Sequence, residues 1–134
     1  IVREELEHFE AVCALLKMRG IRFRRLRPGD YGRRLNTLVD RTEPQRAVDR
    51  LLVAGLIEAR SCERFGILRD HLRDSELADF YGSLFESEAR HHAIYIRLAK
   101  GYATSDEVES RLVTLGCEEA RIVLAGHPLP RMHS

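Results

Sequence analysis

Two short stretches carry a glutamate followed three residues later by a histidine. Residues 87–92 read SEARHH, with Glu88 and His91, and residues 4–8 read EELEH, with Glu5 and His8. Three residues are close to one helical turn, so within a helix each pair projects from one side. Carboxylates and imidazoles together are ligands for iron, manganese or zinc. The spacing therefore indicates a divalent metal site, although two such pairs alone are a weak signal.

The pairs interrupt apolar seams of the helices predicted around them. In a helix bundle, positions spaced alternately three and four apart face the neighbouring helices. Those positions are Leu77, Tyr81, Leu84, Glu88, His91, Tyr95 and Leu98 around one pair, and Ile1, Glu5, His8, Val12 and Leu15 around the other. A third helix presents Leu51, Gly55, Glu58, Cys62 and Phe65. We therefore predict inward ligands at Glu5, His8, Glu58, Glu88 and His91, and a solvated Glu63 on another face.

Unpaired ionisable groups inside a bundle are costly, which leaves two interpretations of this set. One is a buried network of ion pairs and hydrogen bonds, and the other, which explains the set better, is a metal site. Ferritin-like di-iron proteins use a Glu from each of two helices and a Glu-x-x-His from each of the other two. The chain supplies both pairs and Glu58, so we expect the other lone Glu on a helix before residue 1. Tyr81 and Tyr95 flank the site, either as hydrogen-bond donors to it or as core aromatics.

Helical patterns cover the chain, and no stretch alternates like a strand. We predict helices at about 1–18, 44–69, 75–100 and 105–125, with a shorter one near 31–40. Gly20 is expected to end the first, and Asp74 or Ser75 and Thr104 or Ser105 are expected caps. The fold class is therefore all-α, a single antiparallel helix bundle over residues 1–134. Because the first helix starts without a cap, we expect an earlier segment, which makes the domain N-terminally incomplete.

Composition excludes several broad classes. Charged residues make up 32% of the 134 residues and the formal net charge is +1, so no global field favours nucleic acid or a membrane. No run is long enough to predict a membrane span. Cys13, Cys62 and Cys117 are odd in number and far apart, which is typical of buried free thiols in a reducing compartment. We therefore expect a cytoplasmic protein with no membrane partner.

One segment departs from this balance. Residues 19–34, RGIRFRRLRPGDYGRR, hold seven Arg and one Asp. Phe23 and Tyr31 lie among them as stacking surfaces, so the segment is a candidate for binding phosphates and a base. The alternative is a solvated loop whose Arg residues pair with nearby Glu. The candidate RNA-binding residues are Arg22, Arg24, Arg25, Arg27, Arg33 and Arg34, and the tail residues Arg131 and His133 rank below them because a chain end is usually mobile.

Longer motifs carry a resemblance to a known family. LLVAGLIEARSCERF at 51–65, FYGSLFESEARHHAIYIRLA at 80–99, the stretches EELEHFEAV, MRGIRF and RPGDYGRRL, and the ending PLPRMHS resemble the bacterial tRNA isopentenyladenosine hydroxylases of the MiaE type. The resemblance covers essentially the whole chain. It implies a ferritin-like non-haem di-iron monooxygenase that hydroxylates the isopentenyl group of 2-methylthio-isopentenyl-adenosine next to the tRNA anticodon.

The resemblance also implies cofactors and partners. Two iron ions would be held by Glu5, His8, Glu58, Glu88 and His91, with O2 as co-substrate. An external donor, a reductase or a ferredoxin, would supply electrons, and tRNA would be the macromolecular partner. The family's first Glu, on an earlier helix, has no counterpart in these residues, and the resemblance strengthens the Arg-rich segment as the tRNA contact.

Two rival functions remain open from the sequence. A ferritin-like iron-oxidising or storage protein would use the same ligands but needs only an ion path, whereas a hydroxylase needs a pocket wide enough for a purine. A non-catalytic helical module would bind RNA through the Arg-rich segment and would purify without metal.

Overall fold

The computed structural model describes residues 1–128 and 131–133, and these form five helices. They are α1 (Val2–Met18), α2 (Tyr31–Asn36), α3 (Gln45–His71), α4 (Ser75–Ala99) and α5 (Ser105–Leu124). The four long helices begin and end within two residues of their predicted bounds, and the described residues contain no strand. Part of the predicted irregular tail, residues 129–130 and 134, lies outside the described residues.

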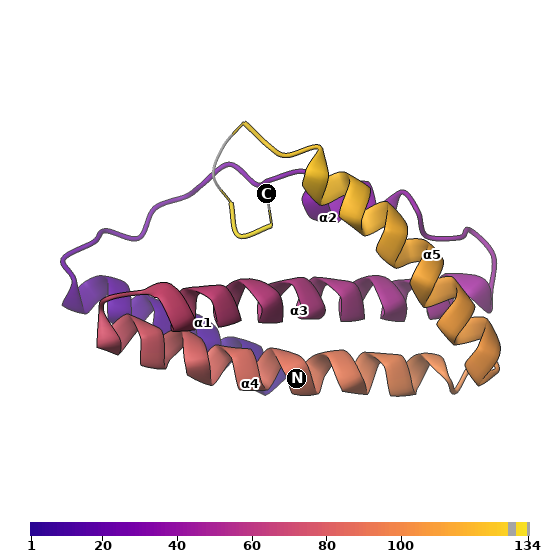
Figure 1. Cartoon of the computed structure of the whole chain (residues 1–134), viewed down its shortest axis with the longest axis horizontal. Helices are drawn as coiled ribbons and strands as arrows, with labels where there is room; N and C mark the ends of the chain where they lie inside the picture. Colours follow the sequence, from indigo (N-terminus) through magenta and orange to yellow (C-terminus); the bar gives the residue numbers. More distant parts are fainter. Residues whose placement is uncertain (129–130, 134) are drawn as a thin grey trace.

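Helices α3 and α4 form an antiparallel hairpin, whose two helices make the most extensive packing contact in the described chain (Figure 1). The Asp74 carboxylate caps α4 by accepting the Leu77 N–H at 3.0 Å, as predicted. The helices approach closely at Gly55, where an added Cβ would lie 3.4 Å from Ile96 Cδ1 and from Tyr95 Cβ. A side chain at position 55 would therefore press directly on α4.

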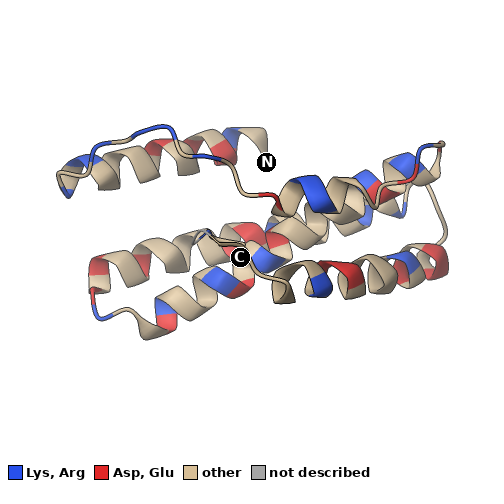
Figure 2. Cartoon of the chain, turned by 90° about the horizontal axis from the view of Figure 1, so that it is seen from above, with Lys and Arg blue, Asp and Glu red and all other residues tan. Residues whose placement is uncertain are grey.

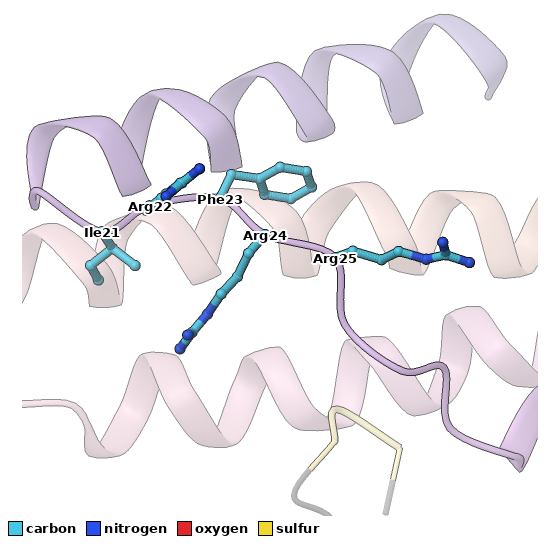
Figure 3. Close-up of a pocket in the computed structure, with 5 residues that line it drawn as sticks. All are labelled: Ile21, Arg22, Phe23, Arg24 and Arg25. Atoms are coloured by element: carbon cyan, nitrogen blue, oxygen red, sulfur yellow. The ribbon is translucent and has the colours of Figure 1, made fainter.

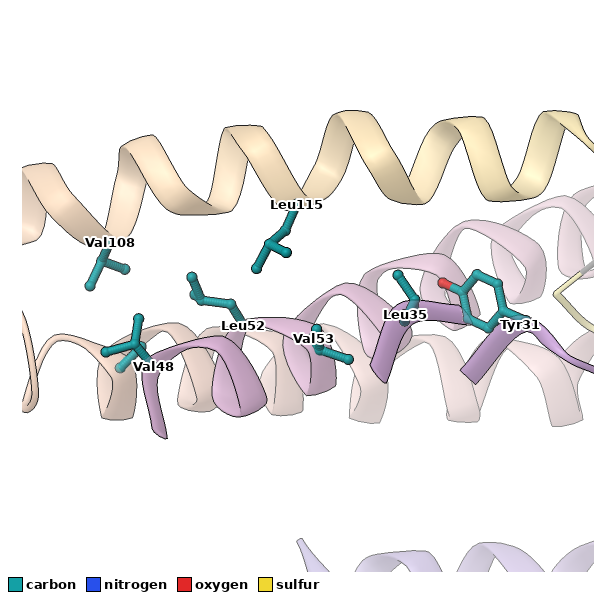
Figure 4. Close-up of a cluster of buried hydrophobic side chains, with 8 residues drawn as sticks. Tyr31, Leu35, Val48, Leu52, Val53, Val108 and Leu115 are labelled. Atoms are coloured by element: carbon teal, nitrogen blue, oxygen red, sulfur yellow. The ribbon is translucent and has the colours of Figure 1, made fainter. Parts of the chain in front are cut away.

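One end of this hairpin is covered by α2 and α5, and the apolar core lies there (Figure 4). The buried apolar residues that form this core cluster are Tyr31, Leu35, Val48, Leu52, Val53, Ala99, Val108 and Leu115. Thr104 caps α5 in a reciprocal capping box with Glu107. A partly buried ion pair joins α3 to α5, because Arg111 donates to both carboxylate oxygens of the buried Asp49 at 2.7 Å.

The short helix α2 ends at Asn36, four residues before its predicted end at residue 40. The Thr37 hydroxyl donates to the Arg34 carbonyl at 2.6 Å, and the next backbone N–H groups bond three residues back instead of four. The chain therefore leaves the helix through tighter turns.

Helix α1 lies apart from the apolar core, alongside the other half of the hairpin (Figures 1 and 2). All of Val2–Met18 is described, and none of it is buried. Val2, Leu6 and Phe9 are more than half exposed. The helix ends at Met18, and Gly20 terminates it from just beyond the C-cap as predicted, with φ +66° and the Ile21 N–H bonded to the Leu16 carbonyl at 2.8 Å.

The Arg-rich segment, residues 19–34, leaves the end of α1, runs as exposed coil from Ile21 to Gly29 and then enters α2. Figure 2 shows the Lys and Arg positions that recur along this coil. Within the described residues, no helix combines the length and apolar character that crossing a membrane requires. Cys13, Cys62 and Cys117 are free thiols, but none of them is buried as predicted, because Cys117 is exposed and the other two are half-buried.

Candidate metal centre

Four predicted ligands from three helices converge beside the middle of the α3–α4 hairpin. Glu5 of α1, Glu58 of α3, and Glu88 and His91 of α4 each place a ligand atom within 4.8 Å of all the others. His91 is fully buried and Glu88 is 6% exposed, so both lie inward as the seam predicts. Three carboxylates at this separation repel one another unless protons or a cation lie between them.

The imidazole of His91 is oriented by a carboxylate that the sequence reasoning missed. His91 Nε2 lies 2.9 Å from Glu4 Oε2, and we assign this as a hydrogen bond donated by the ring. The bond from His91, ahead of the nearby positive charges, lowers the pKa of Glu4 to about 2, so Glu4 remains an ionised acceptor. The Nδ1 atom of His91 is then left with its lone pair.

That lone pair points at another acceptor. His91 Nδ1 is 3.1 Å from Glu5 Oε1, yet this buried nitrogen makes no hydrogen bond to any described residue. Two acceptors at this distance are both satisfied by a cation placed beside them. The orphaned nitrogen therefore fits a metal ligand whose orientation is fixed by a second carboxylate, as is usual for histidine ligands.

The pair Glu88 and Glu58 shows the same electrostatic conflict. Burial, followed by the hydrogen bond and charge of Glu58 and then the charge of Glu5, raises the pKa of Glu88 to about 9. Without a cation, Glu88 thus retains a proton at neutral pH, and a bound divalent ion would replace that proton.

His8 lies at the edge of the cluster. Its Nδ1 is 3.7 Å from Glu5 Oε1 and 3.8 Å from Glu88 Oε1, and its ring centroid is 6.2 Å from that of His91. The prediction that the α1 pair is as inward as the α4 pair is not met, because the Glu5 side chain is 48% exposed and that of His8 is 22% exposed. The physical reason is that none of the described helices covers the outer side of α1.

The two flanking tyrosines separate into different roles. Tyr95 is half-buried, and burial followed by the charges of Glu58, Glu5 and Glu88 raises its pKa, which places its hydroxyl in the field of the cluster. Tyr81 instead stacks on Phe65 at 5.6 Å and meets Phe80 edge-on, as a core aromatic would. Glu63 is exposed and pairs with Arg60, in agreement with its predicted solvated face.

The six candidate arginines do not share one environment. Arg22, Arg24, Arg25 and Arg27 lie on the exposed coil, and Arg33 is exposed on α2. Arg34 is half-buried and donates to the Ile122 carbonyl at 3.4 Å, so it contributes to the contact between α2 and α5. A partly buried bidentate pair, Arg60 with Glu119 at 2.8 and 2.6 Å, was not predicted.

Comparisons with known proteins agree with this arrangement. Residues 1–134 match the family profile described as tRNA-(MS[2]IO[6]A)-hydroxylase (MiaE). Over the whole chain, identity is 40% to tRNA 2-(methylsulfanyl)-N(6)-isopentenyladenosine(37) hydroxylase of Pseudomonas putida, covering 65% of that protein. For the hydroxylase of the same name from Salmonella typhimurium the identity is 36%, covering 49% of that protein. The chain thus spans less than two thirds of either relative.

A solved structure gives the same result for the fold. It is described as Protein 43 with aldehyde deformylating oxygenase activity from Synechococcus, and it superposes with a TM-score of 0.91 at 42% identity, covering 98% of this chain and 67% of that one. The prediction of an all-α, ferritin-like bundle is confirmed. The carboxylate and histidine cluster in such a bundle fits iron binding.

Proposed function

Because the chain belongs to the family described as tRNA-(MS[2]IO[6]A)-hydroxylase (MiaE), we propose that it is the ligand-bearing part of a tRNA hydroxylase. The substrate group is the isopentenyl chain of 2-methylthio-isopentenyl-adenosine next to the anticodon, and the compartment is the cytoplasm. The observation that carries the proposal is the convergence of Glu5, Glu58, Glu88 and His91 within 4.8 Å in a chain of this family.

Five residues would hold two iron ions: Glu5, His8, Glu58, Glu88 and His91. When bound, the ions supply the activation of O2 that hydroxylation of an unactivated C–H bond requires and that acid–base side chains cannot provide. Two electrons per turnover would come from an external donor, a reductase or a ferredoxin.

The chain's own residues prepare this site in defined ways. Glu4 holds His91 in the tautomer whose Nδ1 is free to bind a metal. Glu88 releases its proton when a metal binds, since its raised pKa applies to the cluster without a cation. The close approach of α3 and α4 at Gly55, one turn before Glu58, helps to exclude water from the buried side of the cluster.

The Arg-rich segment is the proposed contact for tRNA. Ile21, Arg22, Phe23, Arg24 and Arg25 line a hollow of about 550 Å³ (Figure 3). In this view Phe23 lies against α1, and its ring meets Phe9 edge-on at 5.9 Å. Phe9 directly follows His8 in the sequence, so the segment contacts the helix that carries this proposed ligand. Arginines for the phosphates and an aromatic ring for stacking suit a substrate base carried on RNA.

The proposed activity is tested by nucleoside analysis of tRNA from cells with and without the gene for the full-length protein. Loss of the hydroxylated nucleoside in the deletion strain, restored by wild type but not by His91→Ala, is the expected result. An unchanged nucleoside profile after deletion would contradict the activity and favour an iron-oxidising protein.

The tRNA surface needs a separate test. Replacing Arg24, Arg25 and Arg27 together by Gln should weaken tRNA binding and flatten its salt dependence by about one log–log unit per lost phosphate contact. Iron content should not change. The matched control replaces Arg41, Arg50 and Arg97, exposed arginines elsewhere, by Gln. Equal affinities and slopes in wild type and the first variant would exclude this surface.

A further inference from the structure

The Arg-rich segment has little structure of its own to hold it. Residues 21–29, all described, form neither helix nor strand and are exposed throughout. A surface that recognises phosphates by position needs its cations fixed before binding, because ordering a loose loop reduces affinity. The contacts that fix this coil therefore matter for the proposed function.

One such contact comes from the far end of the chain. Arg131 Nη2 donates to the Arg27 carbonyl at 2.7 Å. Arg131 also packs against the coil two residues further on, where a Cβ added to Gly29 would lie 3.5 Å from Arg131 Cγ. The tail thus holds the coil through its backbone, which leaves the Arg24, Arg25 and Arg27 side chains exposed.

The tail is itself bound to the body of the bundle. The ring of His133 stacks on that of Tyr31 at 4.8 Å with an interplanar angle of 8°, and its Nε2 lies 3.1 Å from Ser61 Oγ. Tyr31 in turn donates to Glu119 Oε1 at 2.8 Å, and Arg60 binds the same carboxylate. Burial, ahead of the nearby Arg64 charge, lowers the pKa of His133, so the stacked ring is neutral at physiological pH.

We propose that tail residues 131–133 position the Arg-rich segment for tRNA relative to the metal centre, which rests on the proposed function. The anchor of the tail, Ser61, is buried and lies one helical turn after the proposed ligand Glu58. A continuous set of contacts thus runs from α3 through His133 and Arg131 to the backbone of the coil. The sequence ranked the tail below the Arg-rich segment as an RNA-binding candidate, because a chain end is usually mobile. In this proposal the tail instead links the Arg-rich segment to α3, the helix that carries Glu58.

The decisive variant is His133→Ala in the full-length protein. His133 is neutral, and its ring contacts Tyr31 and Ser61. Its replacement by Ala therefore detaches the tail from the bundle without removing a positive charge. We expect KM for tRNA to rise about tenfold, equivalent to about 1.4 kcal/mol, while kcat and iron content stay unchanged. His133→Phe keeps the stack but loses the Ser61 bond, and it should recover part of the affinity. His71→Ala, at an exposed site on α3, is the control.

A second measurement does not depend on tRNA. Trypsin should cleave after Arg22, Arg24 and Arg25 several times faster in His133→Ala than in wild type, with other sites unchanged. Arg27 is not a trypsin site, because Pro28 follows it. Equal cleavage at these sites, or faster cleavage with an unchanged KM although the triple Arg variant loses affinity, would overturn the proposal. If the triple Arg variant binds tRNA normally, the proposed tRNA surface fails, and this proposal fails with it. Faster cleavage in His133→Ala would then describe only a structural contact.

Discussion

The Glu-x-x-His pairs of α1 and α4 have the same spacing but very different surroundings. Glu88 and His91 lie on a helix packed along its length against α3, and both are buried. Glu5 and His8 lie on a helix that has no buried residue in its described range, Val2–Met18, and Glu5 is 48% exposed. A ligand motif thus fixes which atoms are offered, while the packing of its helix decides how strongly water competes for the metal.

The largest effect is expected from the buried pair. Glu88→Ala and His91→Ala should each lower the iron affinity of the full-length protein roughly a hundredfold, because the metal loses a buried ligand that water cannot easily replace. Metal analysis after equilibrium dialysis measures this. Glu63→Ala should retain wild-type iron, since that side chain is exposed and off the seam.

The exposed pair should be less sensitive. His8→Ala is expected to weaken iron binding by a few tens of fold at most, because a water molecule can reach the vacated position at this partly open edge. The same dialysis, with His8→Ala and His91→Ala side by side, tests the comparison directly. Equal losses would show that burial does not distinguish the two pairs.

The carboxylate behind His91 should have a smaller effect again. Glu4→Gln keeps the shape of the side chain but removes the charge that fixes the His91 tautomer, so iron affinity should fall about tenfold. Glu7→Gln, at an exposed position on the same helix, is the matched control. Unchanged affinity in Glu4→Gln would mean that the hydrogen bond to His91 does not tune the site.

A separate prediction concerns the metal-free protein and its free energy of unfolding. The pKa of Glu88 is about 9 in the fold and 4.5 ordinarily, so between these values the folded state holds a proton that the unfolded chain has released. Stability of the metal-free protein must therefore fall as pH rises through this window. Glu88→Gln removes this dependence. At pH 8 its free energy of unfolding should exceed that of wild type by an amount on the order of 2 kcal/mol. Urea unfolding at pH 5 and pH 8, with chelator present, measures the difference, and a wild-type stability that is flat across this range would contradict it.

Sequence reasoning predicted the long helices and most of the cluster because both follow from a local period. Apolar residues three and four apart mark the packed side of a helix, so Glu58, Glu88 and His91 stand out as exceptions on that side. Glu4 was missed because the seam argument selects one face, whereas a long side chain one position away can reach the same imidazole. A search for a carboxylate beside each ligand could have found it.

Contacts between distant segments left no periodic signal. The pairs Asp49–Arg111 and Arg60–Glu119 join residues about 60 positions apart in sequence, and many charged residues could have formed either pair. The seam also could not show that Glu5 is exposed, because amphipathic spacing predicts the side that a helix turns inward but not how tightly that side is covered.

The connection between α3 and α4 sets an order of events during folding. Only residues 72–74 separate the helices, and their mutual packing is the most extensive in the described chain. Contacts between neighbouring segments close short loops, so this hairpin should form early. Glu58, Glu88 and His91 all belong to this hairpin. A nascent chain can therefore bring three of the five proposed ligands together from one continuous stretch of sequence. Helix α1 precedes that stretch in synthesis but docks onto it later, so metal loading is expected to be the step that completes the assembly.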